Sequence, residues 1–211
     1  MMMVRGYEIP EHELQMLEAD FAEFTLLAKA RGRSIREGIS TTYYHPATMR
    51  KTYVYYLYGE GSKEVGIENV KQVVTYMTGD TAIDSAILVT ENKVSSTAYQ
   101  ELKRMPKYHF QNFRFDELDC NPMEHFLSAK HEIVPKDVLT QINPRDPIQV
   151  SKLPLIIVKD LHYTGFRKID GDPVAKFLGA QEGDIIRVTR RNFFEDTPVK
   201  TSIAYRLVKA I

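Results

Sequence analysis

The sequence predicts an α/β protein with a larger N-terminal α/β domain and a small C-terminal α+β domain. Strand-like and helix-like patterns alternate between Thr52 and Arg114, which favours a layered architecture with some parallel strand pairing. From Asp172 onward the chain instead combines one short helix pattern with two strand patterns that can pair as a hairpin. A proline-rich stretch separates the two parts, with prolines at Pro135, Pro144, Pro147 and Pro154.

Three apolar stripes with helical spacing predict three helices in the first domain. Within each stripe the residues recur at intervals of three or four, so they share one helix face. Gly32 and Gly79 are suitable ends for the first and second helices. The stripes are Leu14, Leu17, Phe21, Phe24 and Ala28, then Ile67, Val70, Val74 and Met77, then Ala98, Leu102 and Met105 within Ser95–Met105.

Three further runs in the first domain predict strands. Thr52–Tyr58 is rich in aromatic and β-branched residues, which suit a pleated, half-buried surface. Ala86–Thr90 is a short apolar run between polar ends, which is typical of a buried strand. Tyr108–Arg114 alternates aromatic and polar residues, and we expect it to be the third strand of the same layer.

The C-terminal part begins with a helix that has recognisable ends. Asp172 is a good N-cap, and Pro173 suits the first helical position, where its missing N–H costs nothing. Gly179 suits the position after the last turn, where a left-handed residue closes the helix. A turn at Gly183 then leads into the two strand patterns. We expect a short helix of about two turns packed on a small sheet.

The proline-rich stretch predicts an extended linker, because proline removes backbone donors and disfavours helix at the preceding residue. We place the domain boundary near residue 130. This gives an N-terminal domain over 1–130 and a C-terminal domain over 131–211, whose proline-rich entry spans 134–154.

Composition is that of an ordinary globular protein of 211 residues, with 43% hydrophobic and 27% charged residues. No apolar run reaches the ~18 residues that span a bilayer, and no secretory signal is recognisable. The single Cys120 indicates a reducing compartment, cytosol or nucleus. Net charge is zero, but residues 151–211 hold 11 Lys and Arg against 7 Asp and Glu, so the tail is basic and the rest acidic.

Residues that could carry catalysis form no convincing pattern. Gly59, Gly61 and Gly66 lack the spacing of a phosphate-binding loop, and a turn is the simpler interpretation. Zinc would need a fourth ligand beside Cys120, His125 and His131. Acidic residues 116, 117 and 119 could bind a divalent ion, but a solvated helix start, where acids interact favourably with the helix dipole, is the better explanation. With no nucleophile motif either, we expect no catalytic residue, metal or cofactor.

Several motifs occur together in the order found in one known family. The C-terminal motifs are Asp172–Ala175, Gly179, Gly183, Ile185–Arg190 and Tyr205-Arg206, preceded by His131–Pro135 and Leu153-Pro154. The N-terminal motifs are Glu64–Ile67, Ala86–Val89 and Met105–Tyr108. From about residue 52 to 211 the chain resembles the fifth subunit shared by the eukaryotic nuclear RNA polymerases. Its C-terminal part is also similar to the corresponding small subunit of the archaeal RNA polymerases.

Three departures from the family pattern indicate a divergent paralogue, or a viral or protist member. Residues 155–171 are an insertion relative to the family. The segment from Arg191 to Pro198 is a longer and more apolar hairpin. Ser95–Ala98 replaces the Thr-Pro-Ser-Ala loop that is common in the family.

The resemblance implies a non-catalytic, structural subunit of a DNA-directed RNA polymerase. The C-terminal assembly domain would dock on the largest subunit, near other small subunits. The N-terminal domain, a three-layer α/β jaw with a mixed sheet, would lie beside downstream duplex DNA and contact it weakly and without sequence preference. No membrane or small-molecule substrate is implied. The location would be the nucleus, or the nucleolus for a protein dedicated to polymerase I, and a virus-encoded origin is the alternative.

The same resemblance suggests which residues make these contacts. Lys93, Ser95, Ser96 and Thr97 precede the third helix and could meet DNA phosphates, although simple N-capping explains them equally well. Phe193 and Phe194 lie at the expected hairpin tip, where adjacent exposed aromatics suit a partner contact. The remaining candidates for the docking face are Asp172, Pro173, Val174, Phe177, Arg190, Tyr205 and Arg206, of which the first three could instead only build their own helix.

Two other classes of function stay open at this point. A small metal-dependent nuclease acting alone would require acids such as Asp84, Glu91 and Asp116 to converge on a metal ion. A free DNA-binding regulator is the second class, and the zero net charge argues against strong binding of that kind.

Overall fold

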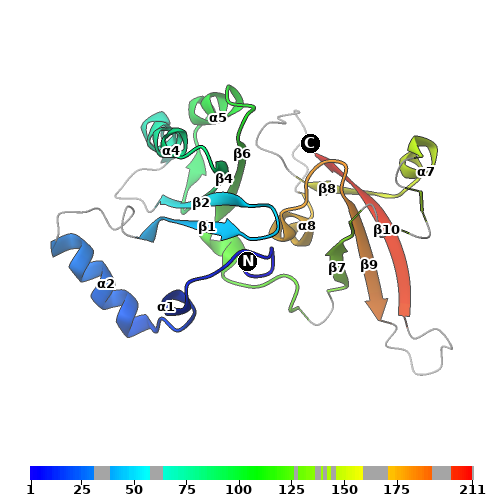
Figure 1. The fold of residues 1–211 in the computed structure, drawn as a ribbon, viewed down its shortest axis with the longest axis horizontal. Coiled ribbons are helices and arrows are strands. Elements are labelled where there is room, and N and C mark those ends of the chain that lie inside the picture. Colours follow the sequence, from blue (N-terminus) through cyan, green and yellow to red (C-terminus); the bar gives the residue numbers. More distant parts are fainter. Residues whose placement is uncertain are drawn as a thin grey trace. The chain divides into compact units, whose positions relative to one another are not determined.

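The chain forms two compact units in a computed structural model, one over Met2–Cys120 and one over Asn121–Ile211. The structure describes residues 1–30, 39–57, 64–125, 128–135, 139, 142–143, 146–158, 171–191 and 201–210 (Figure 1). The division between the units falls before the boundary that the sequence places near residue 130. The predicted α/β class is confirmed, since each unit combines helices with its own sheet.

The N-terminal unit is built on a four-stranded mixed sheet of order β1-β2-β4-β6. The β1–β2 pair is antiparallel, and β2–β4 and β4–β6 are parallel, which confirms the predicted parallel pairing. The three predicted strands are present, and sequence reasoning missed β1. The strands are β1 (Thr41–His45), β2 (Arg50–Leu57), β4 (Ile83–Thr90) and β6 (His109–Arg114).

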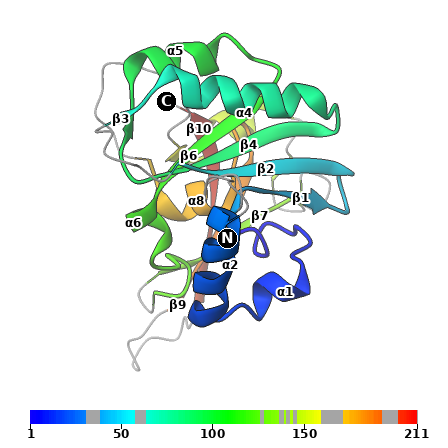
Figure 2. The ribbon, with the colours of Figure 1, turned by 90° about the vertical axis from the view of Figure 1, so that its left-hand side faces the viewer.

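Helices α4 (Ile67–Gly79) and α5 (Ser96–Lys103) lie side by side on one face of this sheet (Figures 1 and 2). The ring of Tyr53 on β2 stacks on Tyr76 of α4 with 4.1 Å between ring centroids. The fully buried positions of the two helices are Val70, Val73, Met77, Ala98 and Leu102. The predicted stripes are therefore confirmed except at three positions: Ile67 is only partly buried, Val73 replaces Val74 as the buried residue, and Met105 lies beyond the end of α5.

The N-terminal residues pack on the opposite face of the sheet. The Tyr7 hydroxyl lies 2.7 Å from Thr52 Oγ1 of β2, and the Arg5 guanidinium lies over the ring of Phe113, 5.7 Å from its centroid. Burial lowers the pKa of Arg5 to about 10. A cation held there among apolar groups fixes the start of the chain against β6.

The first predicted helix is wrong in its extent and in its burial. The structure has α1 (Glu11–Leu14) and, after a break, α2 (Glu18–Ala30), on the side of the sheet opposite α4 and α5 (Figures 1 and 2). Leu14, Leu17 and Phe21 of the predicted stripe are 58%, 69% and 44% exposed. The spacing favours a helix, but the stripe does not face the core of this unit.

Short elements connect the larger ones. Strands β3 (Glu64–Val65) and β5 (Lys93–Val94) form a separate parallel pair, which fixes the start of α5 close to the start of α4. Helix α6 (Phe115–Leu118) follows β6 directly. The Arg114 backbone N–H donates to Glu117 Oε2 at 2.8 Å and so closes the first turn of α6.

The C-terminal unit contains a second mixed sheet, of order β7-β9-β10-β8. β9 pairs with β7 and β10 antiparallel, as the predicted hairpin requires, and β10 pairs with β8 in parallel. The strands are β7 (Lys130–Ile133), β8 (Leu155–Val158), β9 (Ile185–Arg191) and β10 (Thr201–Ala210). β8 uses the first four residues of the 155–171 insertion, so that part of it belongs to the sheet.

The predicted extended linker is wrong over 147–151, where α7 (Pro147–Ser151) forms. Asp146 caps this helix by accepting the Ile148 N–H at 2.9 Å, and Pro147 occupies its first turn. Proline at that position favours the start of a helix, so these prolines do not all signal extended chain.

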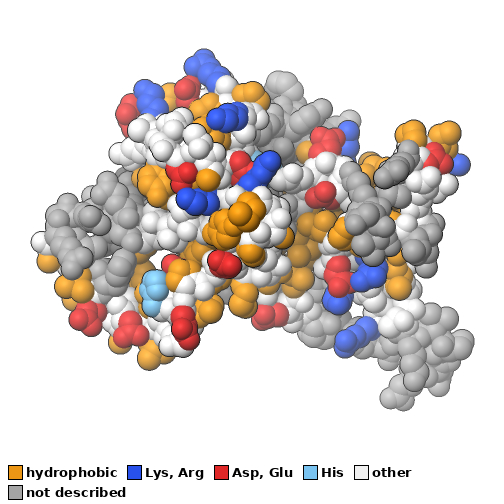
Figure 3. All heavy atoms as spheres, viewed as in Figure 1, with side chains coloured by type: hydrophobic (Ala, Val, Ile, Leu, Met, Phe, Trp, Pro, Cys, Tyr) orange, Lys and Arg blue, Asp and Glu red, His pale blue; other side chains and the backbone are white. Residues whose placement is uncertain are grey.

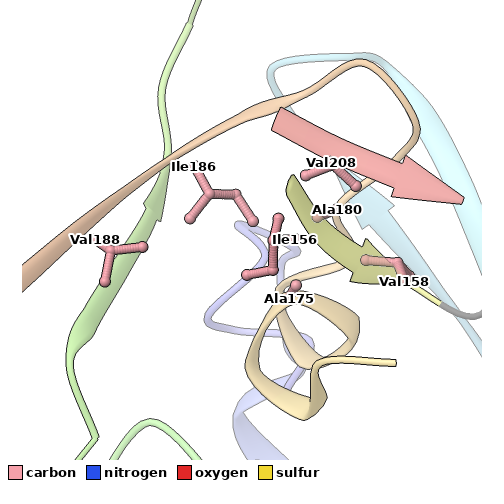
Figure 4. Packing of buried hydrophobic residues seen from close by; sticks show 7 residues of the cluster. All are labelled: Ile156, Val158, Ala175, Ala180, Ile186, Val188 and Val208. Carbon is pink, nitrogen blue, oxygen red and sulfur yellow. The ribbon is translucent and has the colours of Figure 1, made fainter. Parts of the chain in front are cut away.

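Helix α8 (Pro173–Leu178) covers one face of the C-terminal sheet and completes its core (Figure 4). Ala175 of α8 and Ala180 after it meet side chains from three strands. The cluster consists of Ile156, Val158, Ala175, Ala180, Ile186, Val188 and Val208. Alanine on the helix allows a close approach to branched side chains on the sheet. Across the described parts of both units, no helix is long and apolar enough to cross a membrane.

Candidate functional site

The predicted docking residues of α8 mainly build and bury the helix. Asp172 Oδ1 accepts the Ala175 N–H at 2.8 Å, and Gly179 ends the helix in the left-handed region at φ 75°. Val174 and Phe177 are buried, at 7% and 4% exposure. Pro173 alone among the α8 candidates is exposed. A partner would therefore meet this helix at its first turn.

The strand register sorts the remaining candidates onto opposite faces of the C-terminal sheet. Directly paired residues share a face, and successive residues alternate between faces. Arg206 pairs with buried Ile186, so it lies on the face that α8 covers, and Arg190 lies two positions beyond Val188 on that same face. Tyr205 pairs with Arg187 and lies on the other face. The structure does not bring all the predicted docking residues together.

The face that carries Tyr205, here called the outer face, is partly apolar. Leu155 on β8 pairs with Leu207 on β10, and Ile203 lies two positions before Tyr205, so all four share this face. Leu155 is 51% and Ile203 is 56% exposed. Surface of this kind on a small sheet is a candidate for protein contact.

An ion-pair network borders the apolar part of the outer face. Glu132 of β7 accepts from Arg187 Nη2 at 2.8 Å and contacts Lys130 Nζ, also at 2.8 Å. Hydrogen bonds from Lys130 and Arg187 hold the pKa of Glu132 below its usual value, and Glu132 in turn raises the pKa of Arg187. Arginine held in place by a carboxylate is preorganised for further hydrogen bonds.

Sequence reasoning missed most of the outer face. It identified Tyr205 but not Leu155, Ile203 or the Glu132–Arg187 pair. Alternation of apolar residues at Ile203, Tyr205 and Leu207 was the available signal. Leu155 begins the short apolar run Leu155–Val158, which is itself a strand signal, but the run does not show that this strand pairs with β10.

The predicted DNA-proximal residues lie together at the start of α5. Ser95 is the N-cap, and its Oγ accepts the Ala98 N–H at 3.3 Å and lies 3.1 Å from Thr97 Oγ1. Ser96 and Thr97 are exposed on the first turn of α5, and Lys93 is exposed on β5 just before it. Capping is thus one role of Ser95. The structure places a lysine and two hydroxyls beside a helix N-terminus, a group that is chemically suited to phosphate oxygens.

The acids required by the nuclease alternative do not converge. Asp84 Oδ2 pairs with Arg50 at 2.6 Å, and Asp116 Oδ2 pairs with Arg114 at the same distance. Among the residues that the structure describes, no three His, Cys, Asp or Glu are grouped so as to hold a metal ion. That search includes Glu91, Cys120, His125 and His131.

Some predictions concern residues that the structure does not describe. Phe193 and Phe194, the proposed hairpin-tip contacts, lie outside the described residues, as do Gly59 and Gly61. Their roles stay predictions.

Comparison with known proteins identifies the family. Residues 120–208 match the family of the RNA polymerase Rpb5 C-terminal domain. The chain is 39% identical over 85 residues to DNA-directed RNA polymerase subunit Rpo5 of Methanocaldococcus jannaschii. The aligned region covers 40% of this chain and 88% of that subunit.

Similarity to eukaryotic relatives extends over almost the whole chain. The RPABC1 subunit of RNA polymerases I, II and III of Caenorhabditis briggsae is 26% identical over 211 residues, covering 97% of this chain and 88% of that subunit. Subunit 5A of RNA polymerase V of Arabidopsis thaliana is 21% identical over 199 residues, covering 94% of this chain and 81% of its own length. The chain therefore belongs to the Rpb5/Rpo5 family of DNA-directed RNA polymerase subunits.

Proposed function

We propose that this protein is a non-catalytic, structural subunit of a multisubunit DNA-directed RNA polymerase. The observation that carries the proposal is its 39% identity to an archaeal polymerase subunit of which it covers 88%. The eukaryotic relatives, named as subunits of RNA polymerases I, II and III and of RNA polymerase V, support a nuclear location, with the nucleolus expected only for a polymerase I subunit. Its roles are to stabilise the assembly of the subunits and to contact the downstream duplex DNA.

The C-terminal unit docks on the largest polymerase subunit, next to other small subunits. Its outer face supports this role, because exposed Leu155 and Ile203 lie beside Tyr205 and Arg187. Tyrosine and arginine are enriched at the energetic centres of protein interfaces. The network around Glu132 keeps Arg187 in place before a partner arrives, which lowers the entropy cost of docking.

The N-terminal unit acts as a jaw beside downstream duplex DNA. Lys93, Ser96 and Thr97 at the start of α5 supply the phosphate contacts. Such contacts are independent of sequence, as a subunit over a moving template requires. A single lysine gives only weak attraction, which fits a protein with zero net charge.

Affinity purification of the tagged full-length chain from its native cell tests the proposal. We expect the two largest polymerase subunits to be recovered in amounts comparable to the tagged chain. Recovery of the chain alone, or with an unrelated assembly, would refute it.

A further inference from the structure

The segment from Leu14 to Ala30, here called the N-terminal arm, exposes an unusual amount of apolar surface. Every described side chain of α2 is exposed: Ala19, Asp20, Phe21, Ala22, Glu23, Leu26, Leu27 and Ala30. Leu26 and Leu27 are 66% and 49% exposed. Large apolar side chains left in water forgo the free energy that burial would contribute.

The arm starts from a fixed base. Glu8 forms an antiparallel bridge with Tyr44 of β1, and the Tyr43 hydroxyl donates to Glu13 Oε2 at 2.6 Å. Burial and the Glu13 carboxylate both raise the pKa of Tyr43, so the phenol keeps its proton near neutral pH and stays the donor of this hydrogen bond. The chain is therefore held on the sheet up to α1, and the exposed helix begins immediately after this attachment.

The apolar residues of α2 are not confined to one side. At 100° per residue, Leu26 and Leu27 lie on the side of the helix opposite Phe21. A helix that is apolar around most of its circumference is stable when it is surrounded, so a flat surface would leave part of it in water. This geometry requires a groove.

The charge of the arm and of the residues that lead into it indicates what lines that groove. Residues 6–30 contain Glu8, Glu11, Glu13, Glu18, Asp20 and Glu23 against the single Lys29. Figure 3 shows acidic and hydrophobic side chains over α1 and α2. Such a surface repels DNA phosphates and is complementary to a basic protein surface.

We propose that the N-terminal arm docks as a helix into an apolar groove rimmed by Lys and Arg on a neighbouring protein subunit of the polymerase. This inference rests on the proposed function, because it takes the partner from the same assembly. The mode of binding is that of a helix enclosed by a groove, with leucine and phenylalanine side chains as anchors. It gives the chain an attachment through its N-terminal unit that is separate from the outer face of the C-terminal sheet.

Photo-crosslinking within the purified assembly tests this. Benzoylphenylalanine replaces Leu26 in the tagged full-length chain, and replaces Ile148, 64% exposed on α7, in the control chain. We expect irradiation of the Leu26 chain to join it to an apolar, Lys- and Arg-rich segment of another polymerase polypeptide. The Ile148 chain does not join that segment.

Crosslinks from position 26 that stay within the chain, join nucleic acid or are absent would overturn the arm proposal alone, provided that the polymerase subunits are recovered. If no polymerase subunit is recovered with the unmodified chain, the proposed function fails and the arm proposal fails with it.

Two variants measure the contribution of each kind of contact. Leu26→Ser with Leu27→Ser removes exposed apolar area, so the chain folds normally but about tenfold less of the polymerase stays bound after a salt wash. Glu11→Lys, just before the arm, with Glu23→Lys on α2 reverses charge, and we expect a similar loss at low salt. Ile148→Ser is the matched control and retains the polymerase. Full retention by both double variants would contradict the proposal.

Discussion

Single residues at the ends of α8 show how much local chemistry determines. The sequence predicts Asp172 as the N-cap and Gly179 as the left-handed C-cap, and both predictions are confirmed by the Asp172 hydrogen bond and by φ 75° at Gly179. Such features depend on neighbours within four residues, so the sequence contains all the information that they need. The pairing of Glu132 with Arg187 could not be predicted in this way, because 55 residues separate the partners.

Asp172→Ala should destabilise the C-terminal unit by about 1 kcal/mol, the typical cost of a lost N-cap. The Ala175 N–H would lose its acceptor, while the rest of α8 would stay unchanged. Chemical unfolding followed by circular dichroism measures the change. Asp172→Asn is the control, since an asparagine oxygen accepts the same bond. Equal losses for alanine and asparagine would contradict a capping role.

Glu132 should make the stability of the C-terminal unit sensitive to acid. Its pKa is lower in the folded chain than in the unfolded chain, so its contribution is fully present above the unfolded pKa and is lost as pH falls through the folded pKa. Glu132→Gln should therefore cost about 0.5 kcal/mol near neutral pH, and nothing once the carboxylate is protonated. Urea unfolding across a pH series would measure both limits. A difference between the two proteins that is constant across this series would be evidence against the network.

At the scale of elements, periodicity predicts the existence of helices and strands better than it predicts their surroundings. β2, α4, β4, α5 and β6 all lie where the sequence predicts them. The arm has the same spacing as a core helix, yet α2 is exposed, because periodicity does not state which surface covers an apolar stripe. Likewise, the faces on which strand residues lie can be compared between strands only when the register is known. Sequence reasoning therefore places Arg190 and Tyr205 on one docking face, whereas the register puts them on opposite faces of the sheet.

Helix α5 offers a direct test of core packing. Leu102 is completely buried, so Leu102→Ala should reduce the unfolding free energy of the N-terminal unit by roughly 2–5 kcal/mol through lost burial and a cavity. Met105→Ala, beyond the end of the helix and only partly buried, is the comparison and should cost clearly less. Thermal or urea unfolding of the full chain measures both losses. A larger loss for Met105→Ala than for Leu102→Ala would contradict the described packing.

At the scale of the whole molecule, two independently built units carry different charges and different exposed surfaces. The acidic arm belongs to the first unit, and the partly basic outer face belongs to the second. Family motifs spread along the chain allow the family to be predicted from the sequence, because they are local. The surfaces themselves depend on sheet register and on β8, which only the folded chain shows.

Leu155→Ser with Ile203→Ser should weaken association with the largest polymerase subunit about tenfold, as expected when two interface anchors are truncated. Both side chains are about half exposed, so the fold should be retained. Ser202→Ala is the matched control, because Ser202 lies on the same strand but points to the other face. Quantitative co-purification measures the effect, and unchanged recovery of the double variant would exclude the outer face as the docking surface.

The position of β10 has a consequence for synthesis of the protein. Although β10 follows all the other described strands in the chain, it lies between β9 and β8 and is the strand that pairs with β8. Because a ribosome makes the chain from its N-terminus, β8 is finished long before its neighbour exists. Until β10 emerges from the exit tunnel, Ile156 and Val158 lack their packing partner Val208, and chaperones can bind the exposed apolar side chains. A chain that ends before β10 would keep these side chains exposed.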